Sequence, residues 1–216
     1  MSMQLDKVQP KNKTQLKQLI NYAFKHNIYD LNFIDTSEIT DMSLLFSNRM
    51  HNFDVSSWDV SNVIDISFMF YGCHNFNCDL SKWDVSNVTN MSYMFSNCYK
   101  LEGKGLEHWD VSNVTDMASM FYYCKNFDCD LSNWDVSNVK DMSDMFYYCK
   151  KFDCDLSCWN VSNVTYMEYM FTGCEKFNCD LSDWDISNIT RWKNMFSRCD
   201  KMTIPNWYKK LYIVKK

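Results

Sequence analysis

Apolar and polar positions recur along this chain with a period near 25 residues. One unit reads F-x-C-D-L-S-x-W-D-V-S-N-V-T-D-M-S-x-M-F-x-x-C-x-x-F. The tryptophans of successive units are separated by 25, 26, 25, 25 and 25 residues, and they are Trp58, Trp83, Trp109, Trp134, Trp159 and Trp184. A fixed period of about 20–50 residues is typical of solenoids, propellers and other repeat arrays.

The pattern within one unit predicts its local structure. Short alternating segments such as DLSNWDV and NVTDM predict short parallel β-strands. The segment MSDMFYYC predicts a short helical or 3-10 turn that directs Met145 and Phe146 inward. A propeller blade needs about 40 residues, so the shorter unit favours a solenoid in which equivalent side chains of successive turns stack.

The two ends of the chain depart from the pattern. Residues 34–46, IDTSEITDMSLLF, form a decayed unit, and the segment KTQLKQLINYAFKHN before it has helical spacing at Leu16, Leu19, Ile20 and Phe24, with Thr14 as a possible N-cap. We expect this helix and the segment IPNWYKKLYIVKK to close the two ends, because a terminal unit has one neighbour only.

The chain therefore divides into three predicted parts. We expect an N-terminal segment with a capping helix over residues 1–33, a solenoid of about seven 25-residue repeats over 34–202, and a C-terminal cap over 203–216. One residue is inserted before Trp109, in LEGKGLEHW, where Gly103 and Gly105 predict a local bulge.

The repeat resembles a known family. WDVSNVT(D/N)MSxMF, together with xxCxxFxxDLSxW, is similar to the BspA-like leucine-rich repeats, and closest to the branch first noted in mycoplasma surface lipoproteins. That branch also occurs in bacterial cell-surface proteins, protists and giant DNA viruses. The resemblance covers about residues 34–202, and it implies a leucine-rich-repeat-like solenoid that binds other macromolecules.

Composition and charge limit the functional classes. The hydrophobic content of 46% suits a continuous core, and the net charge of −5 argues against a broad nucleic-acid surface. No apolar run approaches the ~18 residues of a membrane helix. The polar N-terminus lacks the apolar region of a signal peptide, so we expect an intracellular (cytoplasmic) or virion location, without membrane insertion or secretion.

Ten of the eleven cysteines belong to the repeat. One column is Cys73, Cys98, Cys124, Cys149, Cys174 and Cys199, and a second is Cys78, Cys129, Cys154 and Cys179. Reduced core thiols are the favoured interpretation. Disulfides between neighbouring turns are an alternative, whereas zinc needs four converging ligands that a straight column does not provide. Cys158 is outside both columns, and we expect it to be exposed.

Methionine, asparagine and aspartate also form columns. The methionines suit adaptable core filling rather than metal binding. The asparagines are expected to bond backbone groups in every turn, and several lie in N-x-T sequons, which leaves glycosylation as an alternative. The aspartates are expected to cap local turns, with calcium between turns as the alternative. These polar columns are Asn62, Asn87, Asn113, Asn138, Asn163 and Asn188, then Asp59, Asp84, Asp110, Asp135 and Asp185, then Asp79, Asp130, Asp155 and Asp180.

No catalytic set emerges from the sequence. The four histidines occur in four different settings, and neither a phosphate-binding glycine loop nor an HExxH motif is present. We therefore expect a protein that is not an enzyme and has no cofactor and no metal site.

Positions that differ between units face water in a repeat protein and carry its specificity. Tyrosines gather at such positions over the central units, and tyrosine supplies a large amphipathic contact area. The candidate binding residues are Tyr93, Tyr122, Tyr123, Tyr147, Tyr148, Tyr166 and Tyr169. The alternative is that these rings only cover the edge of the repeat array.

Three functions fit this pattern. The first is a non-enzymatic protein–protein interaction module, either a virus-encoded host-factor adaptor or a virion component. The second is a structural protein that self-associates through the ends of its solenoid into a capsid or assembly. The third is a surface adhesin that binds carbohydrate or a host protein. A protein partner of unknown identity is expected, and nucleic acid is not.

Overall fold

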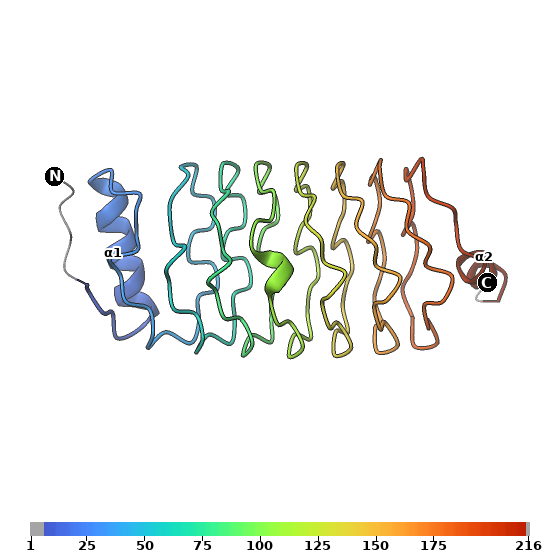
Figure 1. Cartoon of the computed structure of the whole chain (residues 1–216), viewed down its shortest axis with the longest axis horizontal. Helices are drawn as coiled ribbons and strands as arrows, with labels where there is room; N and C mark the ends of the chain where they lie inside the picture. The colour runs from blue at the N-terminus through green and yellow to red at the C-terminus, as the bar shows by residue number, and fades with distance from the viewer. Residues whose placement is uncertain (1–6, 215–216) are drawn as a thin grey trace.

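The computed structural model describes residues 7–214. Its elements are helix α1 (Lys13–Lys25), the 3-10 helix η1 (Leu106–His108) and helix α2 (Asn206–Val214). Between α1 and α2 the chain winds in elongated turns that lie side by side, with one helix at each end of the row (Figure 1). Residues 1–6 and 215–216, which belong to the predicted end segments, lie outside the described residues.

The predicted leucine-rich-repeat-like solenoid of short parallel β-strands is wrong. Residues 7–214 contain two α-helices and one 3-10 helix but no β-strand or sheet. Adjacent turns are joined by isolated parallel bridges at residues 24 to 26 apart, in the column Asp41, Asp65, Asn90, Asp116, Asp141, Tyr166 and Arg191. The predicted helical or 3-10 conformation of MSDMFYYC is also wrong, because that segment forms non-helical turns.

The absence of strands follows from the backbone of each turn. Tyr93 and Asn97 have positive φ angles of 56° and 64°, and the equivalent residues of the other turns do the same. An extended strand requires negative φ at every residue. Met94 N and Cys98 N instead donate to carbonyls three residues earlier, at 3.2 and 2.9 Å, so the segment is a series of overlapping β-turns.

Both predicted end segments form helices. Of the predicted apolar positions in α1, Leu16 and Ile20 are buried and Leu19 and Phe24 are partly buried, so the N-terminal helix is confirmed. The N-cap is Asn12 rather than Thr14, and its side chain accepts a hydrogen bond from Gln15 N at 3.1 Å. No helix within residues 7–214 is long and apolar enough to cross a membrane.

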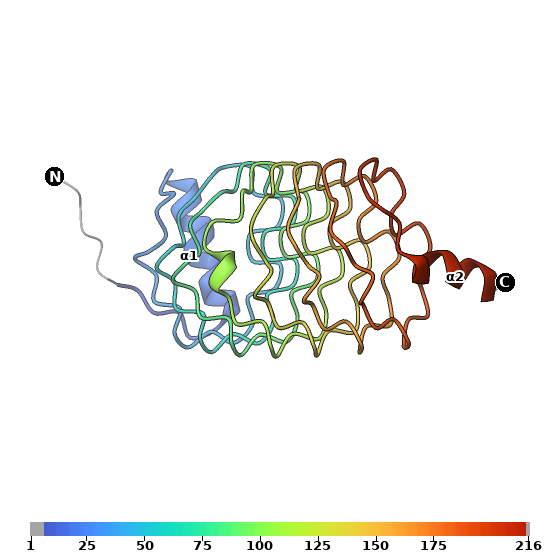
Figure 2. The same ribbon diagram turned by 45° about the vertical axis from the view of Figure 1, so that its right-hand side comes forward.

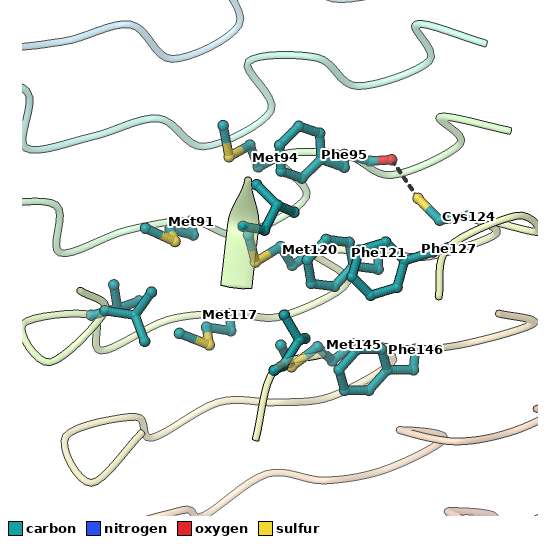
Figure 3. Close-up of a cluster of buried hydrophobic side chains, with 14 of the residues drawn as sticks. Met91, Met94, Phe95, Met117, Met120, Phe121, Cys124, Phe127, Met145 and Phe146 are labelled. Carbon is teal, nitrogen blue, oxygen red and sulfur yellow. Dashed lines mark hydrogen bonds between the residues drawn. The ribbon is translucent and has the colours of Figure 1, made fainter. Parts of the chain in front are cut away.

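The core runs along the inside of the whole row. The repeated tryptophan, phenylalanine and methionine side chains are buried, and Phe121 lies between Phe95 and Phe146 with ring centroids 5.8 and 5.7 Å apart (Figure 3). The indole N–H groups donate hydrogen bonds to carbonyls of the preceding turn. Trp134 Nε1 donates to Leu106 O at 2.9 Å, and the other repeat tryptophans make the same type of bond.

All eleven cysteines are free thiols, and Cys158 is exposed. Each thiol of the first column donates to the carbonyl of a phenylalanine one turn earlier, as Cys124 Sγ does to Phe95 O at 3.0 Å (Figure 3). Burial raises the pKa of Cys73 to about 12 and the pKa of Cys98 well above its usual value. These thiols therefore stay protonated and serve as hydrogen-bond donors.

The asparagine column bonds the backbone of every turn. Each Nδ2 donates to a serine carbonyl of the preceding turn at 2.7–2.9 Å, from Asn62, Asn87, Asn113, Asn138, Asn163 and Asn188. This predicted ladder is confirmed, but its members are exposed rather than buried. The predicted bulge at the inserted residue is wrong, because η1 accommodates it beside Gly105.

Candidate functional site

Four of the predicted tyrosines form one cluster on two adjacent turns. We call Tyr122, Tyr123, Tyr147 and Tyr148 the tyrosine cluster. Tyr122 stacks on Tyr147 with centroids 4.8 Å apart, and Tyr123 stacks on Tyr148 at 5.1 Å. The rings are half-buried. Each stacked pair covers one face of each of its two rings.

The repeat positions these rings. The tyrosine pair directly follows a buried phenylalanine, and the second tyrosine of each pair has a positive φ, 59° at Tyr123 and 57° at Tyr148. Gly173 lies one turn further on, and a Cβ added there would come within 2.9 Å of the Tyr148 ring. A side chain at position 173 would therefore displace the Tyr148 ring from its present position.

The other three predicted tyrosines lie around the cluster. Tyr169 contacts Tyr147 edge-on at 6.4 Å, so it extends the cluster. Tyr93 stacks instead on Phe68 at 4.5 Å. Tyr166 lies in the bridge column, where the Arg191 guanidinium is 5.0 Å from its ring centroid. These three side chains are 36–39% exposed, more than those of the cluster.

Sequence reasoning missed several neighbouring residues. Lys125 Nζ lies 4.9 Å from the Tyr99 centroid and 5.8 Å from that of Tyr123, and Tyr99 stacks on His74 at 4.4 Å. Arg198 donates a hydrogen bond to the Tyr148 hydroxyl. The signal for Tyr99 and Lys125 was their shared position after the repeated cysteine, where the side chains vary from unit to unit.

The acidic flank of the cluster is electrostatically unusual. The pKa of Asp144 is raised to about 6, mainly by burial and to a smaller extent by the nearby carboxylates of Glu168 and Asp141. Burial is also the main cause of the raised pKa of Tyr122. Asp144 thus changes charge near pH 6, whereas the Tyr122 phenol stays protonated at neutral pH.

Asp144→Asn should stabilise the protein at pH 7. The folded state holds a proton on Asp144 up to about pH 6, and the unfolded state releases it near its usual 3.8, so this group adds stability as pH falls from 7 towards 4. For a half-exposed carboxyl screened by solvent we expect a gain of ~1 kcal/mol at pH 7 that disappears near pH 4. Asparagine also suits the φ of 56°, since Asn194 occupies the equivalent position at 58°.

Urea unfolding across this pH range measures the effect. The matched control is Asp135→Asn, because hydrogen bonds from Ser137 lower the pKa of Asp135. The control should lose stability at pH 7 rather than gain it. A gain for Asp144→Asn that is the same at pH 4 and pH 7 would contradict the raised pKa.

The aspartate columns cap local turns, as predicted. Asp84 Oδ1 accepts from Ser86 N at 3.1 Å, and the same bond recurs at Asp59, Asp110, Asp135 and Asp185 and in the second column at Asp79, Asp130, Asp155 and Asp180. Beside the second column lies a cavity of about 290 Å³ lined by residues such as Asp155 and Cys179. Within residues 7–214 no group of three histidine, cysteine or acidic side chains is placed to hold a metal ion.

Comparison with known proteins gives one family. The family described as "Mycoplasma protein of unknown function, DUF285" matches residues 14–105 and 100–207, which together span most of the chain. No curated protein and no solved structure matches. Since the two matched segments include all but the first residue of α1, all the repeated turns and the start of α2, the chain belongs to this Mycoplasma family of unknown function, DUF285.

Proposed function

We propose that the chain is a non-enzymatic protein–protein interaction module whose contact surface is the tyrosine cluster. The observation that carries this proposal is the stacking of four half-buried rings from two adjacent turns, at 4.8 and 5.1 Å. Rings held in this way lose little conformational freedom when a partner binds, so their contact area contributes strongly to affinity.

The surroundings of the cluster favour a protein partner. The net charge of −5 argues against nucleic acid as the partner. The hydroxyl groups suit hydrogen bonds to a polypeptide. Lys125 and Arg198 lie on one side and Asp144 on the other, so the surface offers both charges to a partner.

We also propose that the chain is related to the BspA-like repeat proteins. The repeated WDVSNVT segment supports the relation, and membership of the Mycoplasma family is consistent with it. The relation adds the expectation of macromolecular binding.

A capture experiment from native cell extract tests the tyrosine cluster. The variant combines Tyr122→Ala, Tyr123→Ala, Tyr147→Ala and Tyr148→Ala, and its fold is checked by circular dichroism and thermal unfolding. The control combines Tyr22→Ala and Met50→Ala, which remove exposed apolar area elsewhere on the molecule. We expect the captured protein to bind the wild type and the control directly after purification, and to bind the cluster variant at least about tenfold more weakly.

A captured protein that binds all three forms equally would exclude the tyrosine cluster as the contact surface. A second variant carries phenylalanine at the four positions. Because it retains the rings, we expect it to fold even if the alanine variant does not. It separates loss of hydroxyl groups from loss of rings, and unchanged binding to both variants would overturn the proposal.

A further inference from the structure

The amides of each turn have a repeated set of acceptors in the next turn. Ser119 N, Phe121 N and Tyr123 N donate to the carbonyls of Ser143, Met145 and Tyr147 at 2.8, 2.9 and 2.7 Å. The equivalent amides of the other internal turns make the same bonds. Alternate amides therefore point along the row, towards the C-terminal end.

The last turn has no following turn to accept these bonds. The equivalent amides belong to Asn194, Phe196 and Arg198, and none of them has an acceptor among residues 7–214. Asn194 and Arg198 are exposed. We call the backbone of residues 194–198 the open edge. Unpaired amides in a row are a template for another polypeptide segment.

Helix α2 closes only the inner part of this end. Trp207 Nε1 donates to Leu181 O at 2.7 Å, as a further repeat tryptophan would, and Tyr208 packs edge-on against Phe196 at 5.0 Å. In Figure 2, α2 lies against the last turn and extends beyond it. A segment that adds to the open edge must therefore carry small side chains where it faces α2.

A cavity and several basic side chains lie beside the open edge at the C-terminal end of the row. A cavity of about 310 Å³ is lined by Glu168, Tyr169, Thr190, Arg191, Trp192 and Lys193. It has room for one apolar side chain beside the indole. Arg191, Lys193 and Arg198 place positive charge next to the open edge, and Arg191 is partly neutralised by Glu168 at 3.7 Å. This end of an acidic protein thus suits an acidic segment.

A second copy of the chain is a poor occupant. Two C-terminal ends both present amide donors, so they cannot pair with each other. The carbonyl side of the first turn lies under α1, whose Lys13 Nζ contacts Asp41 and Ser43 at 2.8 and 2.6 Å, and whose Asn21 accepts from Arg49. End-to-end stacking would require α1 to move.

We propose that the open edge binds an acidic segment of another protein, which adopts the turn conformation of an internal repeat segment. The carbonyl oxygens of three alternate residues of this segment accept hydrogen bonds from the three amides of the open edge. It inserts one apolar side chain into the 310 Å³ cavity and carries small residues opposite α2. This site adjoins the tyrosine cluster through Tyr169 and Arg198, but its three amide donors lie outside the cluster and the proposal does not rest on it.

A peptide copied from an internal turn is a suitable probe. Residues 141–148, blocked at both ends, carry the carbonyls that accept from Ser119, Phe121 and Tyr123. The changes Met145→Ala and Phe146→Ala remove bulk that would collide with α2, and Met142 is kept for the cavity. A control peptide has lysine in place of Asp141 and Asp144. Binding to the full chain is followed by amide NMR shifts and hydrogen exchange.

The acidic peptide should shift the amide signals of Asn194, Phe196 and Arg198 and slow their exchange, with the lysine peptide at least about fivefold weaker. Lys193→Glu should weaken acidic-peptide binding roughly threefold to fivefold, whereas Lys151→Glu, at a distant exposed position, should not. No shift at the three amides at millimolar peptide would overturn the proposal, and the basic residues would then only protect the edge from pairing. Protection that appears with rising protein concentration alone would assign the edge to a second copy instead.

Discussion

Phe146→Ala is expected to lower the free energy of unfolding by ~3–5 kcal/mol, the range typical of a buried phenylalanine. The side chain is fully buried in the middle of the row. Its ring centroid lies 5.7 Å from Phe121, 5.7 Å from Phe171 and 4.2 Å from Phe152. Alanine removes contacts to both neighbouring turns, and a repeat protein draws much of its stability from such interfaces.

Phe196→Ala is the matched comparison, because it truncates the same repeat position in the last turn. Phe196 has a stacked neighbour on one side only, Phe171 at 5.8 Å, and α2 on the other. We expect its loss to be about half that of Phe146→Ala. Urea unfolding monitored by circular dichroism gives both values. Equal losses would mean that contacts within a turn, rather than between turns, determine the stability of the row.

The inward-facing positions could be predicted because the same apolar residues recur at these positions from unit to unit. Tryptophan, phenylalanine and methionine recur every 25 residues, and these side chains are buried. An apolar residue that recurs at each turn needs no long-range information to be placed inside. The same recurrence predicted the aspartate caps, which are bonds within one unit, and the asparagine ladder, whose bonds join each unit to the preceding one.

The backbone conformation could not be predicted in the same way. Alternation in DLSNWDV is as compatible with overlapping turns as with a strand, because both expose every second side chain over a few residues. Positive φ usually signals itself through glycine. Here it falls on Tyr93, Ser119 and Tyr148 as well, in a chain with only four glycines. The sequence therefore carried no local warning against strands.

The candidate site was predictable as a region but not as a geometry. Tyrosine at variable positions indicated the part of the repeat in which four of the rings meet. Which rings meet depends on how neighbouring turns align, so Tyr93 pairs with Phe68 and Tyr166 with Arg191 rather than with the cluster. The open edge was not predictable at all, because it requires the partner of every amide to be known.

Gly105→Ala is expected to cost at least about 3 kcal/mol, the second large effect we predict. Gly105 precedes η1 with a φ of 92° and ψ of −10°, a conformation that L side chains rarely adopt. A Cβ there would lie 2.2 Å from Ser81 N and 2.5 Å from Ser81 Cα. Both are backbone atoms of the preceding turn, so no side-chain rotation relieves the contact, and the two turns must separate.

Separation of these turns should be visible at Trp109. Its Nε1 donates to Leu80 O at 3.3 Å, and Leu80 N donates to Lys104 O at 3.1 Å, so the inserted residue lies where two turns are bonded closely. We expect Gly105→Ala to lower the urea midpoint and to expose Trp109 to fluorescence quenching. Lys104→Ala is the control, because it removes only an exposed ion pair with Asp79 and should change stability by less than about 0.5 kcal/mol. A stable Gly105→Ala protein with an unchanged Trp109 signal would show that the inserted turn has room for a side chain, and that η1 does not fix the spacing of its neighbours.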